Sequence, residues 1–261
     1  MKYDVLIIGA GPSGLMAMRE LTKAGCNVCL LEATATAGGR IATINEKGFD
    51  THVETGPEFI HGKLACTLQL LKEAGLTKIP VTGKMIYVQK GEWMHEEQQD
   101  AHWDAFTQRI HAQEKDITIA AFLQQYFSEE KYASLRDGVQ HYAEGFDLAD
   151  ISKASILSAR EEWNHQDETQ YRIKEGYGKL VLYLQQQCLQ HNGTILFDHT
   201  VHKIVHSYNN VTVYTINDKT IDASKIIVTV PLGILQHNSI AFVPSPEEHT
   251  TTIMQLGFGA V

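Results

Sequence analysis

The hydrophobic positions at the start of the chain predict a buried strand, a helix and a second buried strand. Residues 5–8 are all apolar, which suits a parallel strand that is buried on both faces. A helical stretch from about residue 12 to residue 24 follows and ends at Gly25, and a second apolar strand covers residues 27–31. This order predicts an α/β domain with a parallel sheet.

Helical and strand periods then alternate over the next part of the chain. Residues 63–74 are predicted to form a helix, with apolar positions at Leu64, Leu68 and Leu71 and with Gly75 at its end. Residues 84–94 have the pattern of two strands that are joined by a turn at Lys90-Gly91.

The middle of the chain, about residues 96–163, is polar and helical in period. Ser128 is placed to cap the start of one helix. Ala121, Phe122 and Tyr126 mark the apolar face of the helix before it. We therefore expect a mainly helical insertion between two parts of the first domain.

From residue 176 onward the first architecture returns. An amphipathic helix is predicted at 179–191, and a hairpin turn is predicted at Asn209-Asn210. Strands are predicted at 194–197, 201–207, 211–216 and 225–230. The expected organisation is a first domain made of 1–80 and 176–235, a mostly helical inserted segment at 81–175, and the start of a second inserted segment at 236–261.

The composition narrows the function classes. A net charge of −9 argues against nucleic acid as a partner. No stretch approaches the about 18 apolar residues that are needed to cross a bilayer. Met1 and Lys2 lead directly into the first strand without room for a secretory leader, so we expect a cytoplasmic protein.

Cysteine and histidine do not predict a metal or redox site. Cys26 and Cys29 have the spacing of a redox pair, but residues three apart on a strand face opposite sides, which favours core thiols. His199, His202 and His206 lie in a stretch that has the pattern of a half-buried strand, with the histidines near its exposed face. We expect no metal site.

The loop between the first strand and the first helix has the glycine spacing of a dinucleotide site. Gly9 permits a sharp turn out of the strand, and Gly11 removes a side chain that would keep the backbone away from a pyrophosphate. Gly14 lets the helix lie close to the sheet. The free N–H groups at the helix start would then point at the phosphates.

An acid and an arginine follow at the places that such a site requires. The second strand delivers Glu32, which is placed to accept hydrogen bonds from ribose hydroxyls, and its charge would repel the 2′-phosphate of NADP. Arg40 comes after Gly38 and Gly39, which admit a close ligand. This favours a contact of Arg40 with the cofactor over a role as a surface charge.

Four further stretches resemble the flavin-containing amine oxidases, especially the polyamine oxidase branch. These stretches are Gly38-Gly39-Arg40, 54–62, 176–180 and 226–235. The resemblance implies FAD as the cofactor and an α/β fold, in which an FAD-binding Rossmann-like domain of the glutathione-reductase type carries an inserted, mainly helical α+β substrate domain. It also implies that amines are oxidised by hydride transfer to flavin N5, giving an imine and then an aldehyde, while O₂ becomes H₂O₂.

The resemblance also assigns roles to particular residues. It implies that FAD is contacted by Gly9, Gly11, Pro12, Ser13, Gly14, Glu32, Ala33, Gly38, Gly39, Arg40, Gly56, Pro57, Glu58, Phe59, Val201 and Pro231. Val201 would use its backbone atoms to contact adenine. His61 would lie near the substrate, although its own context favours an ordinary turn histidine over direct substrate contact. Glu58 is equally read as a loop carboxylate in an ion pair.

The last residues suggest an incomplete form. Residues 256–261 resemble the start of a strand, and members of the family continue past this point. The resemblance implies that the missing part supplies further substrate and flavin contacts. We therefore expect this chain to be a truncated form that is either inactive on its own or dependent on a partner segment or second chain that completes the fold.

Two other readings stay open. One is another FAD enzyme with the same glycine loop, such as an amino acid oxidase, a carotenoid desaturase or a protoporphyrinogen oxidase. An amino acid oxidase would require an arginine beside the flavin, where this chain has Glu58. The other is a catalytically inactive FAD-binding module.

Overall fold

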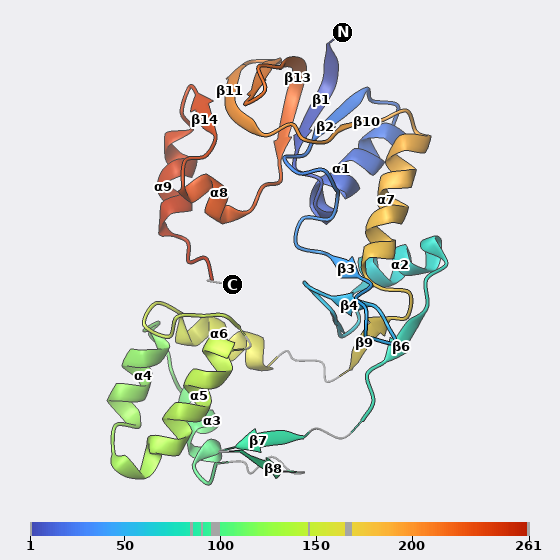
Figure 1. The fold of residues 1–261 in the computed structure, drawn as a ribbon. Helices are drawn as coiled ribbons and strands as arrows, with labels where there is room; N and C mark the ends of the chain where they lie inside the picture. Colours follow the sequence, from blue (N-terminus) through green and yellow to red (C-terminus); the bar gives the residue numbers. More distant parts are fainter. Residues whose placement is uncertain are drawn as a thin grey trace. The chain divides into compact units, whose positions relative to one another are not determined.

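The computed structural model of the protein describes residues 2–83, 86–89, 91–94, 100–145, 147–164 and 169–259 (Figure 1). The chain forms two units. Unit 1 comprises Met1–Val81 and Thr169–Leu256, and unit 2 comprises Thr82–Glu168 and Gly257–Val261. Residues 236–256 thus belong with the sheet-containing unit, whereas the sequence analysis placed them in a substrate segment. The assignment of the two units to cofactor and substrate stays a prediction.

Unit 1 is centred on a seven-stranded sheet in the order β10-β2-β1-β13-β12-β11-β14. The strands are β1 (Tyr3–Ile8), β2 (Val28–Leu31), β10 (Thr194–Leu196), β11 (Val201–Ser207), β12 (Asn210–Thr215), β13 (Thr220–Val228) and β14 (Ala241–Val243). β1 pairs in parallel with both β2 and β13, and β2 pairs in parallel with β10. The pairs β11–β12 and β12–β13 are antiparallel, and β14 is parallel to β11.

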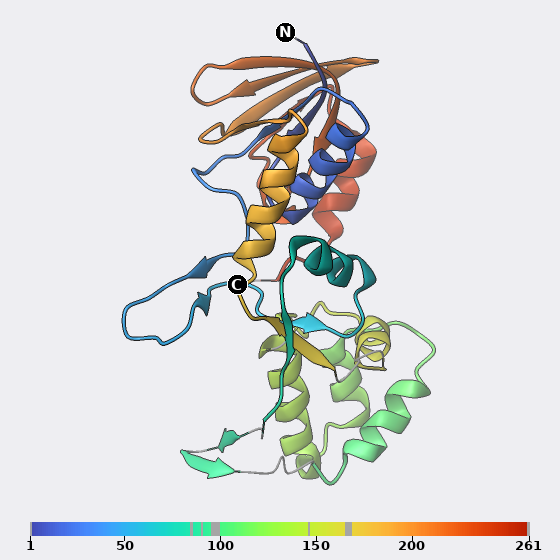
Figure 2. The ribbon, with the colours of Figure 1, turned by 90° about the vertical axis from the view of Figure 1, so that its right-hand side faces the viewer.

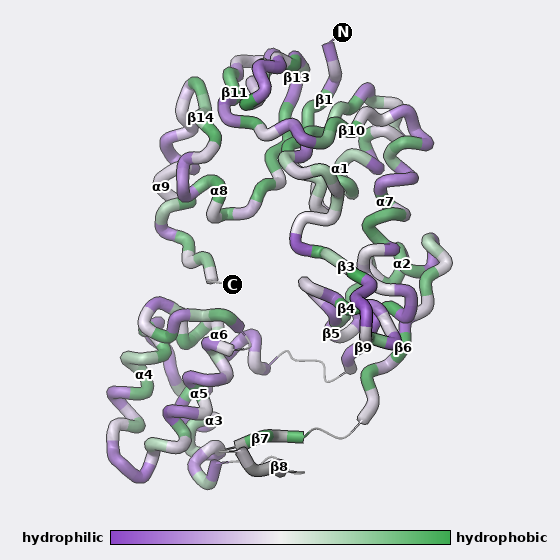
Figure 3. The backbone as a smooth tube through the Cα atoms, viewed as in Figure 1, coloured by the Kyte–Doolittle hydropathy of each residue, from purple (hydrophilic) through white to green (hydrophobic). Residues whose placement is uncertain are grey.

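Both faces of the central strands are covered. Val5 and Ile7 face the helices α1 (Pro12–Lys23) and α7 (Gly178–Gln190), which pack side by side (Figure 1, Figure 2). Leu6 and Ile8 face a second core that contains side chains of β11, β12 and β13. An alternating strand would place polar groups in one of these cores, which explains why residues 5–8 are all apolar. Figure 3 shows hydrophobic and hydrophilic residues alternating in short runs along α7.

The predicted strands of the second half are present with shifted ends. The strand expected at 225–230 is β13, which begins earlier, at Thr220, and ends at Val228. Its first part includes polar residues and therefore lacks the apolar pattern from which the strand was predicted. Asp222, for example, is exposed and accepts a hydrogen bond from Thr212 Oγ1 on β12 at 2.7 Å. The predicted hairpin turn lies at residues 208–209, with Asn209 at φ 53° and Ser207 paired with Asn210.

Two small sheets and a helix also belong to unit 1. β3 (Thr43–Ile44) pairs with β4 (Val53–Glu54), and β5 (Ile60–His61), β9 (Gln170–Ile173) and β6 (Lys78–Pro80) form a three-stranded sheet. The predicted helix is α2 (Ala65–Ala74), and Gly75 ends it in the left-handed conformation, at φ 66°. Leu71 is buried but Leu64 lies just before the helix and is half exposed, so the apolar face was predicted only in part.

The last part of unit 1 is helical. α8 (Leu232–Gln236) and α9 (Glu247–Gln255) follow β13 and β14. The side-chain amide of Gln236 donates to Ile253 O at 3.0 Å and to Leu256 O at 2.7 Å, which satisfies carbonyls at the end of α9. The strand expected at 256–261 is not present over residues 256–259, and residues 260 and 261 lie outside the described residues.

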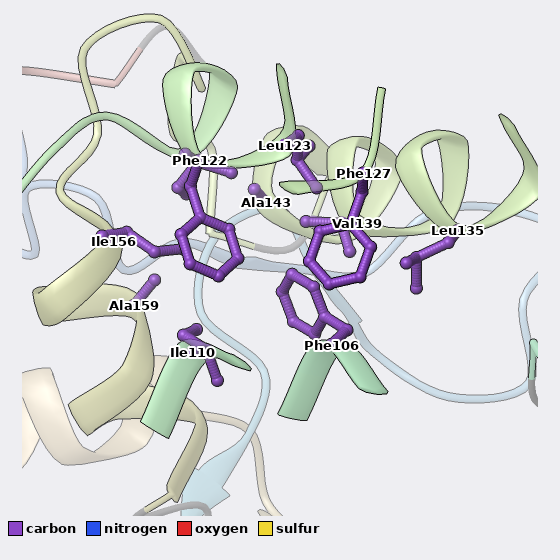
Figure 4. Close-up of a cluster of buried hydrophobic side chains, with 11 residues drawn as sticks. Phe106, Ile110, Phe122, Leu123, Phe127, Leu135, Val139, Ala143, Ile156 and Ala159 are labelled. Carbon is purple, nitrogen blue, oxygen red and sulfur yellow. The ribbon is translucent and has the colours of Figure 1, made fainter. Parts of the chain in front are cut away.

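Unit 2 is mainly helical, as predicted. Its helices are α3 (Trp103–His111), α4 (Ile119–Tyr126), the short 3₁₀ helix η1 (Glu130–Tyr132), α5 (Ala133–Gly145) and α6 (Ile156–Asn164). The core contains several aromatic rings (Figure 4), and the Phe106 ring lies 5.8 Å from the rings of both Phe122 and Phe127. Offset or edge-on ring pairs at this separation stabilise such a core beyond their buried area.

Two local predictions for unit 2 are wrong. Ser128 is not a helix cap, since η1 has Glu129 at its N-cap position and Arg136 donates to Phe127 O and Glu129 O on either side of the serine. Ala121 is exposed and does not belong to the apolar face of α4, where Phe122 is fully buried. The cap that the sequence analysis missed is Thr118, whose Oγ1 accepts the Ala121 amide at 3.2 Å.

The predicted hairpin at 84–94 is present as β7 (Tyr87–Gln89) and β8 (Glu92–Met94), which are antiparallel. Lys84, Met85 and Lys90 of this prediction lie outside the described residues. None of the helices in the described ranges has the length and apolar character that a membrane crossing requires.

Candidate cofactor-binding site

The glycine turn after β1 has the geometry that its sequence predicted. Gly9 adopts φ 103°, which side chains rarely allow. A Cβ on Gly14 would overlap the Gly9 carbonyl oxygen, so a glycine is needed where α1 passes the turn. A Cβ on Gly11 would meet nothing within 4 Å. The space in front of Gly11, at the start of α1, is therefore open to a ligand. Pro12 and Ser13 begin α1 and are exposed beside it.

Glu32, directly after β2, is a buried acid that binds the glycine turn. Its side-chain Oε2 accepts the Ala10 amide at 2.7 Å. Its Oε1 accepts both the amide and the hydroxyl of Thr34, each at 2.9 Å. A carboxylate accepts about four hydrogen bonds, so these three leave room for one further donor, such as a ribose hydroxyl.

The segment before Val201 lies against the residues that follow β2. The His199 amide donates to Glu32 O at 2.8 Å, and the Asp198 amide donates to Thr34 O at 3.1 Å. Val201 itself is buried, whereas Ala33 is exposed. The structure thus places the predicted adenine-contacting residue close to the predicted ribose-binding acid.

The Gly38-Gly39-Arg40 stretch folds onto the same turn. The Gly38 amide donates to Ala10 O at 2.9 Å, and a Cβ on Gly39 would lie 3.3 Å from the Gly11 Cα. Arg40 is exposed, and in the described part of the chain no side chain forms a hydrogen bond or ion pair with its guanidinium. An exposed cation beside the glycine turn is suited to a phosphate.

The segment from Gly56 to His61 continues away from this turn. A Cβ on Gly56 would overlap the Arg40 carbonyl oxygen, so residue 56 touches the arginine loop. Glu58 forms an ion pair with Arg172 on β9, with 2.7 Å between Oε1 and the guanidinium. The same guanidinium lies 5.1 Å from the Phe59 ring. These contacts agree with the reading of Glu58 as a loop carboxylate in an ion pair.

The remaining predicted residues lie at the edges of this region. Pro57 and His61 are exposed, and the His61 ring makes an edge-on contact with Phe59 at 6.2 Å. Pro231 is exposed and precedes α8, two residues after Thr229, whose amide donates to Ile8 O at 2.9 Å. The segment at Pro231 therefore leaves the sheet beside the glycine turn.

A buried polar cluster behind this region was missed from sequence. The Glu54 carboxylate accepts Thr43 Oγ1–H at 2.5 Å and the Tyr177 amide at 2.7 Å, and its side chain is 7% exposed. The His52 Nε2 lies 3.6 Å away. Burial, followed by the nearby Glu54 charge, raises the pKa of the Tyr177 hydroxyl. The sequence feature that could have indicated this cluster is the Gly176-Tyr177-Gly178 turn. Both glycines lie so close to Thr43 that a Cβ on either would crowd it.

The described residues contain no group of three metal-ligating side chains. Among the cysteines, Cys29 and Cys188 are buried, Cys26 is partly buried and Cys66 is exposed, and all four are free thiols. Burial raises the pKa of the Cys29 and Cys188 thiols to about 11, which disfavours the reactive thiolate.

The glycine turn, the buried acid and the helix-covered sheet together define an α/β protein of the dinucleotide-binding class. A sequence profile described as flavin containing amine oxidoreductase matches residues 12–261. The chain therefore belongs to the family of flavin-containing amine oxidoreductases, as the sequence resemblance indicated, and the flavin of this family is FAD, as expected.

Relatives of known name are similar over nearly the whole chain. Polyamine oxidase 4 of Oryza sativa subsp. japonica is 26% identical, over 98% of this chain and 57% of its own length. Lysine-specific histone demethylase 1 homolog 2 of the same plant is 25% identical, over 98% of this chain and 36% of its own length. The chain thus spans about a third to somewhat over half of the length of these relatives.

Solved structures show the same fold. Putrescine oxidase bound to putrescine superimposes with a TM-score of 0.78 at 21% identity, over 95% of this chain and 62% of that one. Cyclohexylamine oxidase from Brevibacterium oxydans gives a TM-score of 0.78 at 19% identity, over 97% of this chain and 63% of that one. These similarities confirm the predicted fold class.

Proposed function

We propose that this chain binds FAD, with the ADP part of the cofactor at the glycine turn. The observation that carries the proposal is the open space at Gly11, at the start of α1, while Gly9 and Gly14 are packed against other atoms. The exposed Arg40 follows Gly39, which lies against Gly11. A helix start with unpaired N–H groups binds phosphate. The neighbouring cation would bind the same group.

Each predicted residue has a distinct part in this proposal. Glu32 would accept a ribose hydroxyl with its remaining acceptor position, and it already fixes the Ala10 amide. The backbone at Val201 would contact adenine, because residues 198–200 lie against residues 32–34. The run from Gly56 to Phe59, together with Pro231, would line the flavin side.

We further propose that the protein takes part in the oxidation of a small-molecule amine, with O₂ as the final acceptor. FAD supplies the hydride acceptor for such a reaction. The role of this chain is to bind and orient the cofactor, and its exposed His61 would lie toward the amine. Support comes from the family and from relatives that are named polyamine oxidase, putrescine oxidase and cyclohexylamine oxidase.

The cofactor proposal is tested by titrating the purified 261-residue chain with FAD. Binding should change the flavin fluorescence and raise the melting temperature, since a ligand that binds only the folded state stabilises it. NAD and NADP serve as controls and should protect less. Protection by NAD without any effect of FAD would contradict the proposal.

The amine proposal needs a separate assay. Release of peroxide from the FAD-loaded chain is followed with spermine, putrescine and an aromatic amine, and with an amino acid as the control substrate. Release that requires both FAD and an amine supports it. FAD binding without release from any amine would mean that these 261 residues bind the cofactor but do not oxidise an amine on their own, and release with the amino acid alone would favour an amino acid oxidase.

A further inference from the structure

The hydroxyl of Thr229 lies beneath the glycine turn, although Thr229 is far from this turn in the sequence. Thr229 directly follows β13, and its Oγ1 lies 2.9 Å from Ile8 O and 3.2 Å from Gly9 O. A single hydroxyl proton is thus shared between two carbonyl oxygens. It binds the chain at the step where β1 ends and the turn begins.

The peptide unit between Gly9 and Ala10 is held at both ends. Its carbonyl faces Thr229, and its N–H donates to Glu32 Oε2 at 2.7 Å. The two partners follow β13 and β2, the strands on either side of β1. Because a peptide unit is a rigid plane, partners at its two ends fix its orientation.

Two glycines of the turn leave the space that this hydroxyl occupies. A Cβ on either Gly9 or Gly14 would lie 2.9 Å from Thr229 Oγ1. A Cβ on Gly11 would meet neither Thr229 nor any other atom within 4 Å. The glycines of the motif thus divide into two that accommodate Thr229 and one that faces the ligand side.

We propose that Thr229 is a positioning residue, which orients the turn so that its backbone is ready for the cofactor pyrophosphate. The inference rests on the proposed binding of FAD. Thr229 acts through the Gly9–Ala10 peptide and does not itself touch the cofactor. A turn that is already held in its binding conformation avoids the entropic cost of being ordered by the ligand.

The test compares Thr229→Val and Thr229→Ala with Thr229→Ser, which keeps the hydroxyl. Valine has nearly the shape of threonine, and alanine covers the case in which the valine methyl does not fit. The matched control is Thr220→Val, at the exposed start of the same strand. We expect the Kd for FAD to rise about tenfold in the valine and alanine variants and to stay within about twofold in the other two.

Competition with bound FAD separates positioning from general stability. ADP, which contains a pyrophosphate, should weaken by the same factor as FAD in Thr229→Val, whereas riboflavin, which lacks it, should not weaken. Unchanged FAD binding in both hydroxyl-free variants would overturn the inference. So would an equal loss for ADP and riboflavin, or a serine variant as weak as valine. Failure of the unmodified chain to bind FAD would instead overturn the proposed function.

Discussion

The carboxylate of Glu54 accepts the backbone amide of Tyr177 at 2.7 Å and thereby joins β4 to the start of α7. Thr43 completes this junction, because its Oγ1 accepts the Gly178 amide at 2.7 Å. Tyr177 is at the N-cap position but its own side chain forms no cap. Residues far away in the sequence therefore cap α7, and the Glu54 charge faces the positive end of the helix.

Replacement of Glu54 by alanine should destabilise the protein. It removes a buried acceptor of charged hydrogen bonds and leaves the Tyr177 amide without a partner, which costs about 2–3 kcal/mol. The melting temperature should fall by about 2–4 °C for each kcal/mol. Glu46→Ala, an exposed glutamate in the same loop region, is the control and should not shift it. Equal melting curves for the two variants would show that the junction contributes little.

Alanine substitutions at Gly11 and Gly14 should separate cofactor binding from folding. Gly14→Ala forces a Cβ onto the Gly9 carbonyl oxygen and should destabilise the unliganded protein by at least about 2 kcal/mol. Gly11→Ala meets no atom and should change the free energy of unfolding by less than about 1 kcal/mol.

The binding measurement completes this comparison. The new methyl at position 11 would occupy the space proposed for the pyrophosphate, so the Kd for FAD should rise at least about tenfold. Urea unfolding and FAD titration on the same preparations measure the two effects. Wild-type FAD affinity in Gly11→Ala would place the phosphates elsewhere.

Arg40→Ala should weaken FAD binding without affecting the unliganded fold. The guanidinium is exposed and has no partner in the described ranges, so its removal leaves no group unpaired. Loss of a charge-assisted bond to phosphate should raise the Kd by about tenfold to a hundredfold, and the effect should shrink as salt screens the charge. Lys47→Ala, another exposed cation, should bind FAD as the unmodified chain does.

The thiols should react with a disulfide reagent in an order set by burial. At pH 8 Cys66, which is exposed, should react fast, whereas Cys29 and Cys188 should react only on unfolding, because burial raises the pKa of both to about 11. Cys66→Ser identifies the fast phase. A fast phase that survives this substitution and equals two or more thiols would contradict the prediction.

The same pKa shifts predict a loss of stability in alkali. The unfolded thiols ionise at a pKa of about 8.5 and the folded ones at about 11. Cys29 and Cys188 therefore make their full contribution to the free energy of unfolding below about pH 8.5. This contribution is lost as the pH rises toward the pKa of the thiols in the folded protein.

The sequence predicted those parts of the site that depend on neighbouring residues. The glycine turn, α1 and the place of Glu32 at the end of β2 follow from short-range patterns, and the structure has them. The backbone requirement of Gly9 and the buried apolar strand are each visible in a few consecutive residues.

The missed features depend on pairings that are distant in sequence. β9 is a strand because residues 60–61 and 78–80 pair with it, and its own sequence, Gln-Tyr-Arg-Ile, alternates polar and apolar residues over only four positions, which is too short to predict a strand alone. Thr229 and Glu54 could not be singled out from the sequence, because the turns that they contact are distant along the chain. The Ser128 cap was predicted from local chemistry, and the contacts of Arg136 override it.

The position of β1 between β2 and β13 also determines when during synthesis the sheet can close. β2 follows β1 closely along the chain, but β13 ends at Val228, so one edge of β1 lacks its partner until residues 220–228 have been made. An unpaired apolar strand edge invites association with other chains. We therefore expect the nascent protein to benefit from chaperone protection of β1 until β13 has been made.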